Sequence, residues 1–193
     1  EKLRDARTEI ARLREEIQTV RADSEDAKVR LARIEGEKQA EDARRANEKR
    51  AVDQRAAAET LKQTLARFGA VRDGNRGMTL VLAESIWASP RSTNLVAAAA
   101  AKLDQIGALL ANNPNYQISI ESFTDNRGDE GALQQLTQDR ARVLSERLAA
   151  AGVDVTRIQA SGLGGANPVA PNTTVASRAK NRRTEITLGT LGQ

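Results

Sequence analysis

Apolar residues recur at every seventh position through the first third of the chain, in two interleaved series. The first series is Leu3, Ile10, Ile17, Ser24 and Leu31, in which only Ser24 is polar, and the second is Ala6, Leu13, Val20, Ala27 and Ile34. This is the spacing of the a and d positions that pair helices in a coiled coil. The pattern therefore predicts a long helix, the stalk, over residues 1–68, with a coiled-coil seam over residues 3–35. Beyond Gly36 the repeat loses its phase and the seam becomes poor.

Charged residues flank the seam and favour one arrangement of two chains. In a parallel, in-register homodimer, each g position faces the following e position of the second chain. The facing pairs, all of opposite charge, are Glu9 with Arg14, Glu16 with Arg21, Asp23 with Lys28, and Arg30 with Glu35. An antiparallel pair would bring like charges together. The sequence thus predicts a parallel homodimer through residues 3–35, with a trimer, a single helix or a disordered charged linker as alternatives.

The hydrophobic pattern changes near residue 69, where short segments of strand-like alternation and amphipathic helix follow one another. Strands are predicted over residues 79–85, 116–120, 157–161 and 184–188. Helices are predicted over residues 92–111 and 130–151, and a third begins within PNTTVASRAKNRR with Asn172 or Thr173 as its cap. The order βαβαβαβ predicts an α/β sandwich over residues 77–190, with helices packed on one sheet. The turn-rich residues 69–76 are predicted to be a hinge.

Composition supports the same division of the chain. Residues 1–68 hold 17 of the 30 Lys and Arg and 15 of the 26 Asp and Glu, whereas all four Pro and twelve of the thirteen Gly come later. The net charge is only +4, which does not indicate a basic face for nucleic acid. Aromatic residues make up 2% of the chain, too few for base-stacking platforms. No nucleic-acid partner is therefore expected.

The chain has no Cys and no His, which removes thiolate chemistry, the commonest general base and the commonest transition-metal ligand. We therefore expect no catalytic residue, no metal site and no cofactor. No apolar run approaches the roughly 18 residues of a membrane span. The chain begins at Glu1 rather than Met, and we expect it to be a mature or truncated fragment whose targeting or anchoring segment lies upstream.

Arg140 interrupts the apolar stripe of the helix predicted over residues 130–151. The other members of the stripe are Leu133, Leu136, Val143, Leu144, Leu148 and Ala151. Arg140 projects from their face because it follows Leu133 by seven residues. A guanidinium there keeps its proton and needs a partner. Asp125 is the candidate, because it follows a strand at its carboxyl end, where open α/β sheets present ligands. The two residues form either an internal salt bridge or the two sides of a ligand site.

Two further motifs indicate structure more than chemistry. GLGGAN (162–167) is rich in glycine, but no Gly-Lys-Ser/Thr follows, so turn geometry explains it better than a phosphate loop. Arg178 and the NRR run at 181–183 gather basic groups near a helix end. At that position, basic side chains interact favourably with the helix dipole and pair with acidic residues on the surface.

Four spaced motifs together resemble a known domain. They are TDNRG (124–128), LTQDRARVL (136–144), GLGGANPVAPNTT (162–174) and SRAKNRRTEI (177–186). The combination resembles the C-terminal domain of outer membrane protein A, which also occurs in peptidoglycan-associated lipoproteins and flagellar stator B proteins. The resemblance covers residues 77–190 and leaves the stalk outside.

This resemblance implies non-covalent binding of peptidoglycan through the diaminopimelate residue of its stem peptide. Asp125 would accept the ammonium group at the end of the diaminopimelate side chain, and Arg140 would hold the neighbouring carboxylate. Thr124 and Arg178 match motif positions beside this pair. The resemblance also implies a periplasmic protein that is attached to the outer membrane through an upstream segment and tethers that membrane, or an envelope complex, to the wall.

The chain departs from the family pattern at several positions. Leu133 stands where the family has an Asn whose amide would help to line the ligand pocket. Ser122 and Phe123 replace Gly and His, Thr137 replaces Ser, and Ser177 replaces Gly. Two functions of other classes remain as alternatives. One is an envelope adaptor whose domain binds a protein rather than the wall, and the other is an enzyme acting on the wall, disfavoured by the missing His and Cys.

Overall fold

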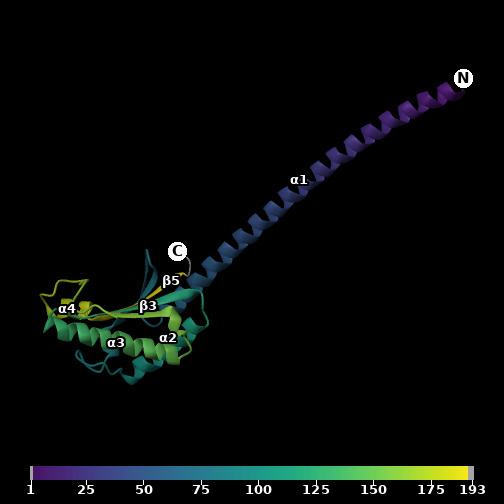
Figure 1. Cartoon of the computed structure of the whole chain (residues 1–193). Helices are drawn as coiled ribbons and strands as arrows, with labels where there is room; N and C mark the ends of the chain where they lie inside the picture. The colour runs from purple at the N-terminus through teal and green to yellow at the C-terminus, as the bar shows by residue number, and fades with distance from the viewer. Residues whose placement is uncertain (1, 191–193) are drawn as a thin grey trace. The chain divides into compact units, whose positions relative to one another are not determined.

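The computed structural model describes residues 2–190 of the 193-residue chain, which divides into two compact units between residues 57 and 58. Helix α1 (Lys2–Leu65) is continuous over 64 residues and passes through Gly36 without a break (Figure 1). Its sequence is dominated by Ala, Glu, Arg and Lys, which are strong helix formers. The long N-terminal helix predicted from the sequence is therefore confirmed.

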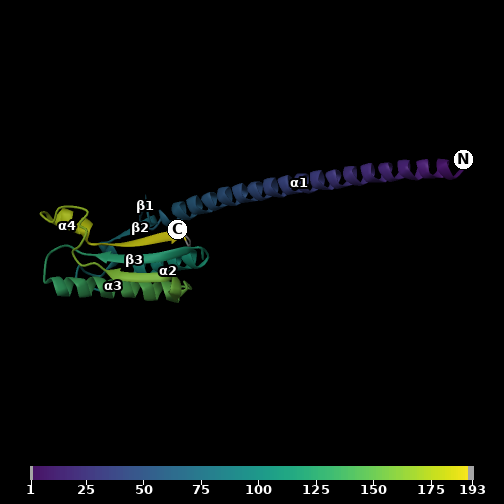
Figure 2. The same ribbon diagram turned by 45° about the horizontal axis from the view of Figure 1, so that its top comes forward.

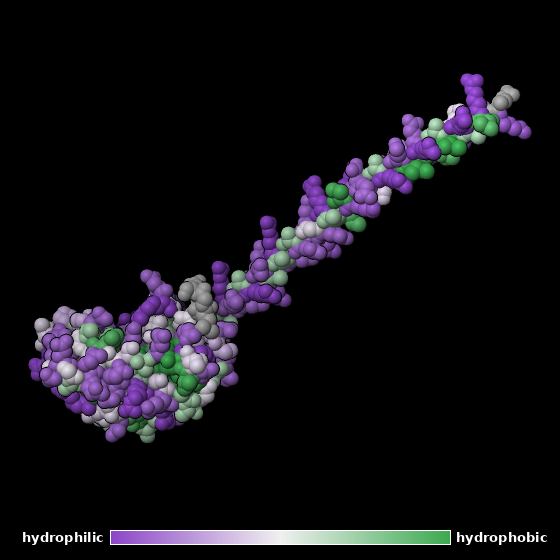
Figure 3. Space-filling view, viewed as in Figure 1, coloured by the Kyte–Doolittle hydropathy of each residue, from purple (hydrophilic) through white to green (hydrophobic). Residues whose placement is uncertain are grey.

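The residues of the predicted seam lie exposed along the N-terminal part of α1. Leu3 is 71% exposed and Ile17 is 52% exposed, and Figure 3 shows apolar side chains along the helix among hydrophilic ones. A second helix could bury such a stripe, and this burial would stabilise the pair of helices. Within residues 2–190, no helix is long and apolar enough to cross a membrane.

The last turns of α1 belong to the C-terminal unit. Leu61 and Leu65 are almost fully buried and join its hydrophobic core, and Phe68 packs against the same core. The sequence assigns these residues to the stalk because the change to a composition rich in Gly and Pro comes only after residue 68. Their burial instead places the division between the two units after residue 57.

Residues 69–76, predicted to be a hinge, form an edge strand and a tight turn. Strand β1 (Ala70–Gly74) pairs antiparallel with β2 (Gly77–Ala83), and Gly74 faces Gly77 across the turn. Glycines on both sides of a two-residue turn provide the backbone freedom that a hairpin needs. The same composition suggests flexibility when only the sequence is considered.

Five strands form one sheet in the order β1-β2-β5-β3-β4. The last strand, β5 (Arg183–Thr190), lies between β2 and β3 (Tyr116–Phe123) and runs antiparallel to both. Strand β4 (Ile158–Gly162) pairs parallel with β3. Because β2, β3 and β4 run in the same direction, their carboxyl ends and the start of β5 meet at one end of the sheet.

Helices α2 (Ala97–Ala111) and α3 (Glu130–Ala150) cover one face of the sheet (Figures 1 and 2). The core between these helices and the sheet includes Leu80, Leu103, Ile106, Leu110, Ile118, Ile120, Leu144, Leu148, Ile186 and Leu188, all nearly inaccessible to solvent. Buried and polar residues alternate along β3, as expected of a strand with one face on the core. The predicted α/β sandwich is confirmed.

The starts of helices α2 and α4 differ from those predicted. Helix α2 begins at residue 97 rather than 92, because Ala88 N–H donates to the carbonyl of Asn94 at 2.8 Å and holds residues 88–95 as a loop. We call these residues the covering loop. Helix α4 (Val175–Asn181) is capped by Thr174, which accepts a hydrogen bond from Ser177 N–H at 3.1 Å, and not by either of the two residues before it. Short 3-10 turns (Glu84–Ile86 and Val155–Arg157) complete the domain.

Candidate functional site

Five charged side chains gather at the end of the sheet where β2 and β3 stop and β5 begins. Glu84 directly follows β2, and Asp125 lies two residues beyond β3. Arg182 directly precedes β5, whereas Arg178 lies on α4 and Arg140 on α3. We call these five residues the charged cluster. Its members are up to 98 residues apart in sequence, so the fold alone brings them together.

Asp125 is 7% exposed, and its carboxylate is hydrogen-bonded through both oxygens. Oδ1 accepts from the backbone N–H of Arg127 at 2.9 Å, and Oδ2 accepts from Arg182 Nη1 at 2.6 Å. Burial acts to raise the pKa of Asp125, but these hydrogen bonds and the charges of Arg182 and Arg178 outweigh it. The pKa of Asp125 therefore lies below its ordinary value, and the carboxylate is ionised at neutral pH.

Arg182 joins Asp125 to the second carboxylate of the cluster. Its Nε donates to Glu84 Oε2 at 2.5 Å, while its Nη1 holds Asp125. Burial acts to lower the pKa of Arg182, but its hydrogen bonds to the two carboxylates raise it above the ordinary value. The other oxygen of Glu84, Oε1, is buried and accepts no hydrogen bond from residues 2–190. Leaving a buried acceptor unpaired is costly, so this oxygen marks a position where a donor would bind favourably.

The guanidinium of Arg140 is enclosed by the covering loop, and the residue is 1% exposed. Nε donates to the carbonyl of Ser92 at 2.9 Å, and Nη2 donates to the carbonyls of Pro90 at 3.0 Å and Ser89 at 3.2 Å. The guanidinium carbon also lies 4.9 Å from the centroid of the Trp87 ring, a cation–π contact. Nη1 forms no hydrogen bond within residues 2–190, so one edge of the group remains unused.

Arg140 keeps its positive charge in this environment. Burial lowers the pKa of Arg140 to about 10, the negative charge of Glu84 opposes this change, and the positive charge of Arg182 adds to it. A pKa of about 10 is still far above neutral pH. The group therefore remains a cation, and the nearby carboxylate that stabilises it most is Glu84.

Asp125 and Arg140 do not form the internal salt bridge that the sequence left open. Within residues 2–190, the ion-pair partner of Asp125 is Arg182, and the hydrogen bonds of Arg140 go to the covering loop. The reason is the strand order. Because β5 lies between β2 and β3, Arg182, which directly precedes β5, is placed to pair with Asp125. Asp125 and Arg140 are thus members of one cluster that are linked through Arg182 and Glu84.

The other predicted site residues lie close to this cluster. Thr124 is 4% exposed and donates its backbone N–H to the carbonyl of Gly164 at 2.8 Å. Arg178 is 6% exposed, and its charge helps to lower the pKa of Asp125. Leu133 is buried beside the loop that follows Asp125, where its Cδ2 would lie 3.6 Å from a Cβ at Gly128. Leu133 therefore places an apolar side chain beside this loop.

The glycine-rich motif sets the height of α3 above the sheet. A Cβ at Gly162 would lie 2.1 Å from the backbone nitrogen of Gln138, so only glycine allows this approach. Gly164 has φ +53°, and its N–H donates to Thr137 Oγ1 at 2.9 Å. These contacts hold the helical turn that precedes Arg140 against the end of β4. Turn geometry and close packing thus account for these glycines.

Glu84 and Arg182 are the site residues that reasoning from the sequence missed. Arg182 belongs to the NRR run, which looked like a set of charges at a helix end. Glu84 stands at the carboxyl end of a strand, as Asp125 does, and this shared position was the available signal.

The cluster has the chemistry of a binding site for a charged small group. It contains two carboxylates and three guanidinium groups, all shielded from solvent to some degree. The excess of one positive charge favours a ligand with a carboxylate. The unpaired oxygen of Glu84 favours a ligand that also carries a hydrogen-bond donor.

Comparison with known proteins gives consistent matches to one family. Residues 89–182 match the OmpA family. The probable lipoprotein YiaD of Escherichia coli (strain K12) is 38% identical over 100 residues, which are 52% of this chain and 46% of YiaD. The peptidoglycan-associated lipoprotein of Rhizobium meliloti (strain 1021) is 32% identical over 125 residues, which are 64% of this chain and 71% of that protein. The chain thus spans about half the length of YiaD.

A solved structure shows a similar fold. The cell wall anchor of the T6SS from Pseudomonas aeruginosa superposes with a TM-score of 0.58 at 26% sequence identity. The similarity covers 65% of this chain and 90% of that one.

Proposed function

The chain belongs to the OmpA family, and on this premise we propose that residues 77–190 bind peptidoglycan without catalysing a reaction on it. The relative from Rhizobium meliloti is named as peptidoglycan-associated, and the similar structure from Pseudomonas aeruginosa is a cell wall anchor. The observation that carries the proposal is the charged cluster, because partly buried charges of both signs at one sheet end suit a ligand that is itself doubly charged.

The ligand that we propose is the diaminopimelate residue of the stem peptide, whose side chain ends in an ammonium group and a carboxylate on the same carbon. Asp125 would accept the ammonium group, and Arg140 would donate to the carboxylate through its unused Nη1. Because the covering loop encloses Arg140, which is 1% exposed, the ligand carboxylate must reach Nη1 along its unused edge or displace a loop carbonyl. Thr124 and Arg178 would complete the wall of the site, with Arg178 adding positive charge.

Glu84 supports a ligand that carries an ammonium group. Its buried Oε1 has no donor within residues 2–190, and an ammonium group supplies three. Both carboxylates of the cluster are held in place by Arg182. A bound ammonium group would therefore meet acceptors whose positions are already fixed, which reduces the entropy lost on binding.

For the stalk, we propose a parallel homodimer through residues 3–35. The exposed apolar stripe of α1 supports it, as do the four facing charge pairs. Two of these pairs compete with contacts inside the helix, since Lys28 bonds Glu25 at 2.8 Å and Glu9 lies 4.0 Å from Arg12. Burial of the stripe would therefore supply most of the stabilisation, and the charges would select the orientation.

The cellular role that follows is a tether between the cell wall and the outer membrane or an envelope complex. We place the protein in the periplasm, associated with the outer membrane, because the relatives named above are lipoproteins. A second function, that of an envelope adaptor whose domain binds a protein instead of the wall, is favoured by one observation. Leu133 is buried where the family has an amide, which removes a polar group from the ligand pocket.

Cosedimentation of the full chain with purified peptidoglycan sacculi tests the proposal. Wild type should sediment with sacculi, and Asp125→Ala should lose this binding, because removing a buried charge-assisted contact costs about 2–5 kcal/mol. Arg142→Ala, at an exposed position of the same helix as Arg140, is the matched control and should bind like wild type. Wild type that stays in the supernatant would favour the adaptor, and equal retention of Asp125→Ala would remove the site assignment.

A further inference from the structure

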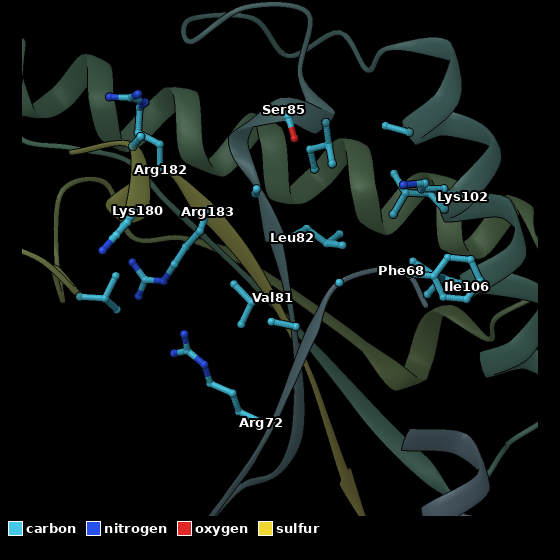
Figure 4. Close-up of a pocket in the computed structure, with 18 residues that line it drawn as sticks. Phe68, Arg72, Val81, Leu82, Ser85, Lys102, Ile106, Lys180, Arg182 and Arg183 are labelled. Carbon is cyan, nitrogen blue, oxygen red and sulfur yellow. The ribbon is translucent and has the colours of Figure 1, made fainter. Parts of the chain in front are cut away.

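A groove of about 540 Å³ lies between β1, the end of β2, α2 and α4. Its floor is apolar and includes Phe68, Val81, Leu82, Ile86 and Ile106. Its rim carries Arg72, Lys102, Lys180, Arg182 and Arg183, and none of its lining residues is Asp or Glu. Figure 4 shows Lys180, Arg182 and Arg183 on one side of Leu82, with Lys102 on the other. We call this site the basic groove.

Three cations of the basic groove have no acidic partner. Arg182 and Arg183 are bound to carboxylates of their own, the latter to Glu185 at 2.5 Å. By contrast, Arg72, Lys102 and Lys180 form no ion pair among the residues that the structure describes, and all three are exposed. The groove therefore presents an uncompensated positive potential above an apolar floor, which is complementary to a ligand with carboxylates and apolar groups.

The basic groove also contains an open strand edge. Strand β1 begins at Ala70, which faces Val81, so β2 continues through Ala83 without a neighbouring strand on that side. The carbonyl oxygen of Val81 faces β1, because it lies 2.5 Å from the position of a Cβ at Gly69. Backbone polar groups alternate sides along a strand, so Ala83 directs its N–H and C=O the same way, beyond the end of β1.

We propose that the basic groove binds an extended, acidic segment of a partner protein in which carboxylate and apolar side chains alternate. The backbone of the segment would pair with the edge of β2 at Ala83, in the manner of strand addition. Its apolar side chains would enter the floor, and its carboxylates would meet Arg72, Lys102 and Lys180. An anionic lipid would suit the charges and the floor but would leave the strand edge unpaired.

This inference goes beyond wall binding and concerns a separate surface. The guanidinium of Arg182 is directed to Glu84 and Asp125, so the charged cluster and the basic groove meet at one residue without sharing a ligand position. The domain could therefore hold a partner protein while it is bound to the wall. The two activities should respond to different substitutions.

Fluorescence anisotropy of the full chain with a labelled Val-Glu-Val-Glu-Val-Glu peptide tests the proposal. We expect saturable binding that weakens by about tenfold or more in the triple variant Arg72→Glu, Lys102→Glu and Lys180→Glu, and that weakens with added salt. Lys49→Glu, a charge reversal on α1 outside the groove, is the matched control and should bind like wild type. Circular dichroism checks that the triple variant is folded, and single Gln substitutions at the same positions replace it if it is not.

Two further measurements separate the proposed ligand from other binders. A peptide N-methylated at alternate amides should bind at least about tenfold more weakly than its parent, because it cannot pair with the edge of β2. The amide resonance of Ala83 should shift on titration with the parent peptide. The proposal is overturned by absent saturation, by equal binding of the methylated peptide or of the charge-reversed chain, or by binding of phosphatidylglycerol vesicles without binding of the peptide.

Discussion

At the scale of single residues, two buried arginines of the domain differ in one informative respect. Arg157 donates to the carbonyls of Tyr116, Leu110 and Asn113, which together use all of its guanidinium nitrogens. Arg140 also donates to carbonyls, but its Nη1 is unused and it lies near Glu84. Carbonyl contacts alone therefore explain a structural arginine such as Arg157. The unused edge and the charged neighbours make Arg140 a binding candidate.

Replacing Arg140 should affect the stability of the fold as well as binding. Arg140→Lys keeps the charge but loses the planar fork that reaches three carbonyls and Trp87, and we expect a loss of about 3 kcal/mol in the free energy of unfolding. Urea denaturation measures this change, with Arg142→Ala as the exposed control that should leave the midpoint unchanged. An Arg140→Lys chain as stable as wild type would contradict the enclosed geometry of this side chain.

Asp125 should make the stability of the domain depend on pH. Its pKa is lower in the folded chain than in the unfolded chain, so the charged form stabilises the fold above the unfolded pKa of about 3.9. This contribution is lost as the pH falls through the folded pKa. At pH 7, Asp125→Asn should therefore unfold at a lower urea concentration than wild type. Its free energy of unfolding should be lower by about 1–3 kcal/mol.

The difference between Asp125→Asn and wild type should shrink as the pH falls below about 4. Asp26→Asn on α1 serves as the control and should follow wild type at every pH. A difference that stays constant from pH 7 to pH 3 would mean that the Asp125 carboxylate is not held in its charged form by Arg182.

At the scale of elements, the position of α3 depends on one glycine. Gly162→Ala would place a methyl group within 2.1 Å of the α3 backbone, and such overpacking typically costs about 1–3 kcal/mol. The matched control is Gly36→Ala in α1, where nothing lies within 4 Å, so this change should strengthen the helix slightly. Thermal unfolding followed by circular dichroism measures both. Equal stability of Gly162→Ala and wild type would show that α3 does not contact β4 this closely.

The stalk offers a similar matched comparison. Ile17 occupies an a position of the heptad, whereas Val29 lies on the outer face of the same helix, and both are exposed in the single chain. In sedimentation equilibrium, the full chain should behave as a dimer, and Ile17→Lys should shift it toward monomer by placing a charge in the seam. Val29→Lys should leave the dimer intact. A wild-type chain that remains a monomer at high concentration would refute the seam.

Local patterns predicted some elements better than others. The periodicity of α3 and the alternation in β3 are strong, so the helix with Arg140 and the strand before Asp125 could be located from the sequence. Strand β1 was missed because AVRDG is short, mostly exposed and lacks alternating apolar residues. The link between Asp125 and Glu84 through Arg182 depends on the order of strands in the sheet. That order is set by packing between distant segments, which local periodicity does not encode.

At the scale of the whole molecule, the two compact units suit two different tasks. Residues 2–57 form helix with an exposed apolar stripe, a surface suited to pairing two chains. The unit from Ala58 onward holds the core, the charged cluster and the basic groove. If α1 pairs in parallel, each dimer carries two copies of the proposed wall-binding site, and binding to one polymer would gain from the effective concentration of the second site.

The most direct measurement of the central claim is an NMR titration of the full chain with a stem tripeptide that contains meso-diaminopimelate. A tripeptide with lysine at the same position lacks the side-chain carboxylate and is the matched control. We predict saturable shifts at Thr124, Asp125 and Arg140 with the first peptide and at least about tenfold weaker binding of the second. Absent shifts at these residues, or equal affinity for the two peptides, would contradict a site in which Asp125 and Arg140 hold one doubly charged group.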